Sequence, residues 1–67
     1  MSEYQAMIYR NNRNRTFIAN CLMKNLMGYG KTEEDAIENL RKSLQATTGE
    51  FEINIKSLYK LPLANNM

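Results

Sequence analysis

The chain has 67 residues, a formal net charge of +2, one cysteine and no histidine. A chain this short forms one small domain with little core to bury, and a single cysteine excludes an internal disulfide. Without histidine or clustered acids at ligand spacing, we expect no metal, no cofactor and no enzyme activity. Association with another subunit then remains as a source of stability.

The sequence shows no targeting signal and no membrane-spanning segment. The N-terminus has no basic and apolar leader, and no apolar run approaches the roughly 20 residues that cross a bilayer. We therefore predict a cytoplasmic protein that does not enter a membrane. A net charge of +2 is too small to indicate nucleic acid as the partner.

Two strands joined by a turn are predicted at the start of the chain. Residues 4–10 alternate between faces, and residues 16–23 are rich in strand formers. The asparagines in residues 11–14 tolerate left-handed φ angles and bond their own backbone, which favours a turn. One face is expected to carry Tyr4, Ala6, Ile8, Phe17, Ala19, Cys21 and Met23. The other face is expected to carry the candidates for an oligomer interface, Met7, Tyr9, Ile18 and Leu22.

A short third strand and a helix follow. Lys24 and Asn25 interrupt the second strand, and residues 26–30 form the third one, reached by a tight turn. Thr32 is a typical N-cap, and the three acids after it suit the positive end of a helix. Gly49 is suited to end the helix. The apolar stripe consists of Ala36, Ile37, Leu40 and Leu44, and Glu38 is expected to face Lys42 on the exposed side.

The last strand is predicted within residues 51–61, and residues 62–67 form a tail that frays. Leu58 interrupts its alternation. Residues 1–61 thus make a single domain. The apolar side of this strand consists of Phe51, Ile53, Ile55, Tyr59 and Leu61.

The predicted fold is α+β, with the order β-β-β-α-β and one helix packed on one face of a mainly antiparallel sheet. A right-handed crossover places the last strand parallel to the first and beside it. One helix covers one sheet face, and the opposite face keeps apolar residues. We therefore predict a homo-oligomer, either a dimer or a tetramer.

Two segments resemble the HicB-type antitoxins. They are residues 17–22, FIANCL, and residues 28–40, GYGKTEEDAIENL, and the likeness spans roughly residues 4 to 60. The resemblance implies a truncated ribonuclease H-like β-β-β-α-β fold without catalytic carboxylates. It also implies a function, which is to bind a small HicA-like mRNA-cleaving toxin and neutralise it by occlusion.

The chain departs from the HicB pattern at two places. Many relatives carry a proline-rich loop before the third strand, where this chain has residues 22–27, LMKNLM. Complete HicB antitoxins also continue into a DNA-binding domain, whereas this sequence stops after its fourth strand. We expect a short form, to which operator binding is not carried over.

A basic hairpin supports a second hypothesis. Arg10, Arg13 and Arg15 lie close together near Tyr9, and with Tyr29 they are candidates for binding phosphates or an acidic protein surface. A solvated hairpin tip is the simpler interpretation. The alternatives to an antitoxin are therefore a stand-alone nucleic-acid-binding domain and a solitary oligomeric protein-interaction domain. Cys21 lacks a neighbouring base and is expected to be structural.

Overall fold

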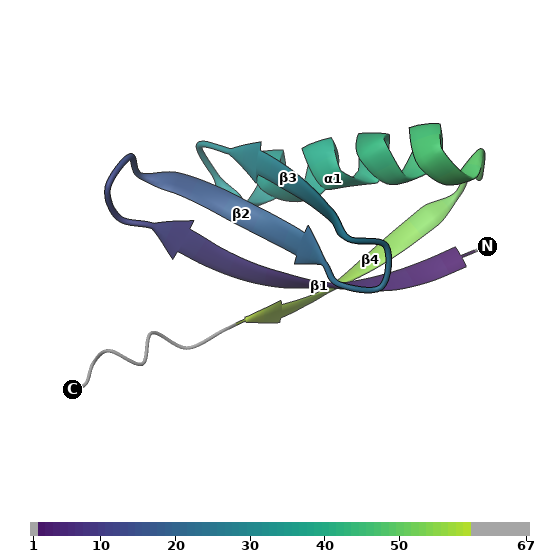
Figure 1. The fold of residues 1–67 in the computed structure, drawn as a ribbon, viewed down its shortest axis with the longest axis horizontal. Coiled ribbons are helices and arrows are strands. Elements are labelled where there is room, and N and C mark those ends of the chain that lie inside the picture. Colours follow the sequence, from purple (N-terminus) through teal and green to yellow (C-terminus); the bar gives the residue numbers. More distant parts are fainter. Residues whose placement is uncertain (1, 60–67) are drawn as a thin grey trace.

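The computed structural model describes residues 2–59, and Figure 1 shows their arrangement. The order β-β-β-α-β is confirmed. Its elements are β1 (Ser2–Asn11), β2 (Thr16–Cys21), β3 (Leu26–Gly30), α1 (Glu33–Thr48) and β4 (Ile53–Tyr59). The predictions for Leu61 and for the tail, residues 62–67, lie outside the described residues.

The strands form one mixed sheet with the order β3-β2-β1-β4. β1 pairs antiparallel with β2, and β2 with β3, while β4 runs parallel to β1 and beside it, with Tyr4 opposite Ile55. This is the arrangement predicted from the crossover. α1 lies along one face of the sheet (Figure 1) and packs chiefly against β3 and β2.

The ends of α1 form at the predicted signals. The amide of Asp35 donates to Oγ1 of Thr32 at 3.0 Å, which caps one of the free N–H groups of the first turn. Gly49 adopts φ 78°, and its amide donates to the carbonyl of Gln45 at 2.9 Å. Left-handed backbone at this position explains why a glycine ends the helix. The buried residues of α1 are Ala36, Leu40 and Leu44.

The ion pair on the outer side of α1 differs from the prediction. Glu38 pairs with Arg41, three residues later, and not with Lys42. The Nε of Arg41 also donates to the carbonyl of Ile53 at 3.3 Å. Arg41 therefore joins the helix to β4 and brings its guanidinium within reach of Glu38.

The core lies between α1 and the sheet. β1, β2 and β4 contribute alternate residues to it, and the free thiol of Cys21 is fully buried, as expected for a structural cysteine. The sheet residues of the core are Tyr4, Ala6, Ile8, Ala19, Cys21 and Ile53, with Phe17, Leu26 and Ile55 packed at its margin.

Two apolar residues lie elsewhere than predicted, and Leu58 has a place that the sequence left open. β2 ends at Cys21, so Met23 lies in the following turn and is exposed. Phe51 precedes β4 and has 89% of its surface exposed. Leu58 interrupts the apolar alternation because it lies on the outer face opposite Met7, while Ser57 takes the inward position and β4 continues to Tyr59. The chain from Gly49 to β4 spans the gap between helix and sheet, which turns Phe51 outward.

Both turns of the antiparallel sheet have four residues, 12–15 and 22–25. In the first turn, Oδ1 of Asn11 accepts from the amide of Arg13 at 3.0 Å, and Oδ1 of Asn14 accepts from that of Thr16 at 3.2 Å. The expected bonding of the asparagines is thus present. The left-handed residue, however, is Arg15, with φ 56°. In the second turn it is Asn25, with φ 55°.

The glycines of β3 permit close packing with the helix. A Cβ atom at Gly28 would overlap the backbone of Ala36 and lie 2.8 Å from the Cα of Leu40. A Cβ atom at Gly30 would lie 2.6 Å from the amide nitrogen of Ala36. These glycines are therefore strand residues on which the helix rests, and they form no turn of their own.

We predict that Gly28→Ala lowers the free energy of unfolding by about 3 kcal/mol or more, because the added methyl group meets backbone atoms that cannot rotate away. Urea titration followed by circular dichroism measures the change. Met27→Ala, on the outward side of the same strand, is the control and should cost about 1 kcal/mol or less. Equal losses in the two variants would contradict this account of the glycine.

Arg15→Gly should raise the free energy of unfolding by about 0.5 to 1 kcal/mol, because left-handed backbone costs arginine more than glycine. Arg13→Gly is the matched control, since it also removes an arginine from the turn but at a position without positive φ. That variant should be slightly less stable than the parent chain. A gain in both variants would point to charge repulsion between the arginines instead.

Candidate functional site

The face of the sheet opposite α1, here called the open face, holds an apolar surface. Residues paired directly across strands lie on the same face. Tyr9 is opposite Ile18, and Ile18 is opposite Tyr29, so these side chains form one row across β1, β2 and β3. Ile18 is buried between its two tyrosine neighbours, with 9% of its surface exposed, although it does not belong to the core under the helix.

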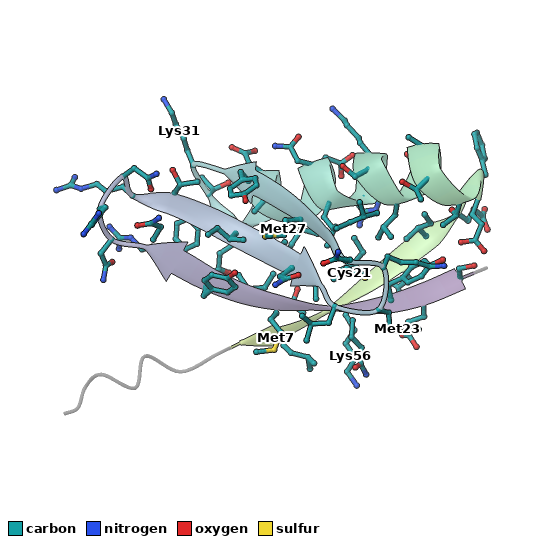
Figure 2. All side chains as sticks on the ribbon, in the orientation of Figure 1. Met7, Cys21, Met23, Met27, Lys31 and Lys56 are labelled. Carbon is teal, nitrogen blue, oxygen red and sulfur yellow. The ribbon has the colours of Figure 1, made fainter. Side chains whose placement is uncertain are left out.

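A second row runs beside the first and crosses all four strands of the described sheet. Leu58 is opposite Met7, Met7 opposite Asn20, and Asn20 opposite Met27. Figure 2 shows the side chain of Met7 projecting from the sheet on the side away from α1. The apolar residues of the two rows form the apolar patch, with the polar Asn20 between Met7 and Met27. The patch consists of Met7, Tyr9, Ile18, Met27, Tyr29 and Leu58.

The exposed members of the apolar patch lie toward the edges of the sheet. Tyr29 is 53% exposed, Met27 44% and Leu58 38%. Several large apolar side chains this exposed on one sheet face are typical of surfaces that contact another protein. Their energetic value is substantial, since full burial of one such side chain contributes about 1.5 to 3 kcal/mol.

The open face becomes polar away from the patch. Toward the N-terminus of β1, Lys56 is opposite Gln5, and Asn54 is opposite Glu3, with Asn54 Nδ2 donating to Glu3 Oε2 at 3.4 Å. Lys56 projects on the same side as Met7 (Figure 2). At the other end of β1, Asn11 lies opposite Thr16, and the exposed turn of residues 12–15 follows.

The residues predicted for an oligomer interface are only partly brought together. The structure places Met7, Tyr9 and Ile18 on the open face, next to one another. Leu22 lies instead in the turn after β2, because the four-residue turn begins there to bring β3 into register. Sequence analysis did not assign Met27 and Leu58 to this surface. Their strand partners, Asn20 and Met7, would have indicated it once the register was known.

The set predicted to bind phosphate or acidic protein is divided between the two faces. Arg10 is paired with Phe17 on the side of the helix, and its Cζ lies 5.9 Å from the centre of the Phe17 ring. Arg13 and Arg15 are exposed in the turn. Tyr29 lies on the open face, where its hydroxyl donates to the sulfur of Met27 at 3.6 Å. These four side chains therefore do not form one cluster.

A polar cluster lies at the other end of the domain, on the side of the helix. Oγ of Ser2 and the hydroxyl of Tyr4 donate to the carboxylate of Glu50, the latter at 2.7 Å. The hydrogen bond from Ser2, followed by that from Tyr4, lowers the pKa of Glu50 below its ordinary value. The bond to Glu50 in turn raises the pKa of Tyr4. Glu50 thus satisfies the hydroxyl of a core tyrosine and stays ionised.

The described part of the chain, residues 2–59, offers neither a metal-binding cluster nor a membrane-spanning helix. No group of three or more cysteine or acidic side chains is placed to hold a metal ion within this range. The one helix of the described residues, α1, is neither long nor apolar enough to cross a membrane.

Comparisons with family models, curated proteins and solved structures yield no match to this chain. The resemblance to HicB antitoxins therefore stays a prediction from the sequence. The fold and the open face define a class, which is a small α+β domain with one sheet face covered by a helix and the other partly apolar.

We predict that stability falls as the pH drops below about 4.3, the ordinary pKa of glutamate. A carboxyl whose pKa is lower in the folded state stabilises the fold above its unfolded pKa, and this contribution is lost as the pH falls through the folded pKa. Urea titrations of the parent chain and Glu50→Gln at pH 7 and pH 3 measure the effect, with pH 7 above and pH 3 below that value. The difference between the two proteins should be larger at neutral pH. An equal difference at both pH values would contradict the role of Glu50.

Proposed function

We propose that this chain is a HicB-like antitoxin, which binds a small HicA-like mRNA-cleaving toxin and neutralises it by covering its surface. The observation that carries the proposal is the apolar patch on the open face. An antitoxin of this kind acts by steric exclusion, and exclusion needs a complementary surface with an apolar centre and a polar rim. The β-β-β-α-β order is the one that the resemblance implies.

The patch has the composition of a contact surface for protein. Tyrosine and methionine are enriched where proteins meet, because they combine a large apolar area with a polar or polarisable end. The patch provides two of each, together with Ile18 and Leu58. Polar residues follow at both ends of β1, from Gln5 on one side to Asn11 on the other.

The same geometry favours protein over nucleic acid on this face. A surface that binds single strands combines stacking aromatics with basic groups along the backbone path. Tyr9 and Tyr29 are separated by Ile18, and the strand residues of the open face carry Lys56 and Glu3 as their charged groups. The guanidinium of Arg10 points to the opposite side of the sheet, over Phe17.

Copurification tests the proposal. A HicA-like toxin should co-elute with this chain and lose its RNA-cleaving activity. Met27→Lys and Tyr29→Lys place a charge in exposed parts of the patch, and each should weaken binding by about tenfold or more. Neither side chain belongs to the core under α1, so the variants should stay folded.

The matched control is Gln5→Lys, which adds the same charge to the polar end of the same face. It should leave toxin binding within about threefold of the parent. If a HicA-like toxin cleaves RNA but neither co-elutes with this chain nor is inhibited by it, the antitoxin function is wrong. If Gln5→Lys weakens binding as much as Tyr29→Lys, the toxin does not centre on the apolar patch.

A further inference from the structure

A polar residue, Asn20, lies among the apolar side chains of the open face. It is directly opposite Met7 on one side and Met27 on the other. Ile18, two positions earlier in β2, lies on the same face. Asparagine is among the residues that are depleted in strands, so Asn20 contributes little to the sheet itself. The fold of the domain therefore does not account for this residue.

The side-chain amide of Asn20 has no partner within residues 2–59. It forms no hydrogen bond with another side chain or with the backbone of this range, and it is half-buried. The amide carries two N–H donors and one carbonyl acceptor, which water satisfies in the free chain. A partner that covers Met7 and Met27 must also cover Asn20 between them. Binding therefore removes the water from this amide.

The loss of water makes Asn20 selective. A buried amide without a hydrogen-bond partner weakens binding by about tenfold or more, so a surface that is apolar throughout is disfavoured. We propose that Asn20 is the specificity-determining residue of the apolar patch, and that it pairs with an uncharged polar side chain of the partner that both donates and accepts hydrogen bonds.

The surroundings of Asn20 favour a side chain without charge. Methionine is longer than asparagine, and Met27 is 44% exposed while Asn20 is half-buried, so the amide lies lower than its neighbours. A polar side chain of the partner can reach the amide between Met7 and Met27, whereas the two methionines hold the main chain of a partner away. A charged group would lose its water among apolar side chains, which opposes binding.

The inference rests on the proposed function, in which the apolar patch binds a HicA-like toxin. It adds the chemistry by which the patch distinguishes that toxin from other apolar surfaces. One polar group inside an apolar interface can do this, as a single buried asparagine does in coiled coils, where it fixes register and oligomeric state. The apolar residues around Asn20 then supply the affinity, and its amide supplies the selection.

Titration calorimetry of the whole chain with a purified HicA-like toxin tests the hydrogen bond. Asn20→Leu removes the amide at similar size and should weaken binding by about tenfold or more, although it adds apolar area. Asn20→Asp keeps the shape but loses both donors, and it should weaken binding by a similar factor. Met27→Leu is the matched control, because it exchanges one apolar side chain for another beside Asn20 and should stay within about threefold of the parent.

Binding of the apolar dye anilinonaphthalene sulfonate tests the selection without a toxin. Asn20→Leu makes the centre of the patch continuously apolar, so its dye fluorescence should rise about twofold or more above that of the parent. Met27→Leu should leave the fluorescence unchanged. Neither residue belongs to the core under α1, and circular dichroism should show both variants folded.

The outcomes separate this inference from the proposed function. If the toxin binds the parent chain and binds Asn20→Leu equally or more tightly, the antitoxin function stands and the inference is wrong. Tighter binding by Asn20→Asp would show a cationic partner group and overturn the uncharged one. If no toxin binds the parent chain, the antitoxin function fails, and the dye decides: a rise in Asn20→Leu supports the selective role of Asn20, and unchanged fluorescence rejects it.

Discussion

The closeness of α1 to β3 is the constraint on which the rest of the domain depends. Gly28 and Gly30 have no side chain, so the helix backbone rests directly on the strand, with Ala36 and Leu40 above these two positions. Leu40 and Leu44 can then reach the centre of the sheet and bury the inward residues of β1 and β2. One helix held on one side leaves the other side without cover. The apolar patch is the consequence of that geometry.

Side chains of the helix also form hydrogen bonds with the two outer strands of the sheet. β3 and β4 are the outer strands, and an unpaired edge strand invites pairing with another chain. Asn39 of α1 donates to the carbonyl of Tyr29 in β3, and Arg41 donates to the carbonyl of Ile53 in β4. Gln45 donates to the carbonyl of Phe51, just before β4, at 3.0 Å. These bonds remove acceptors from both edges, which favours association through the open face over extension of the sheet.

The sequence predicted those features that depend on neighbouring residues. The N-cap at Thr32, the helix end at Gly49 and the alternation of Tyr4, Ala6 and Ile8 are local signals, and each was located correctly. From these the β-β-β-α-β order and the parallel placement of β4 followed.

The errors arose where the position of a residue depends on the register between distant segments. Leu22 and Met23 continue the strand pattern, but the turn into β3 begins at Leu22. Phe51 continues the pattern of β4, yet the chain there is still passing from helix to sheet, held by Gln45. The place of Leu58 on the open face follows from its partner Met7, 51 positions earlier, which is not visible from local spacing. The site was therefore harder to predict than the fold, since the patch exists only through the pairing of strands.

The odd-numbered residues of β1 lie on the open face, and the core under α1 does not explain them. The even positions Tyr4, Ala6 and Ile8 are explained by the core under α1. A sheet face that meets water usually alternates polar residues along its strands, yet Glu3 and Gln5 give way to Met7 and Tyr9 midway along β1. Lys56 stands beside this change, and a charge next to an apolar sheet surface opposes indiscriminate stacking. An apolar centre bordered by charged residues is more specific than a uniformly apolar face, because a partner must match its charges as well as its shape.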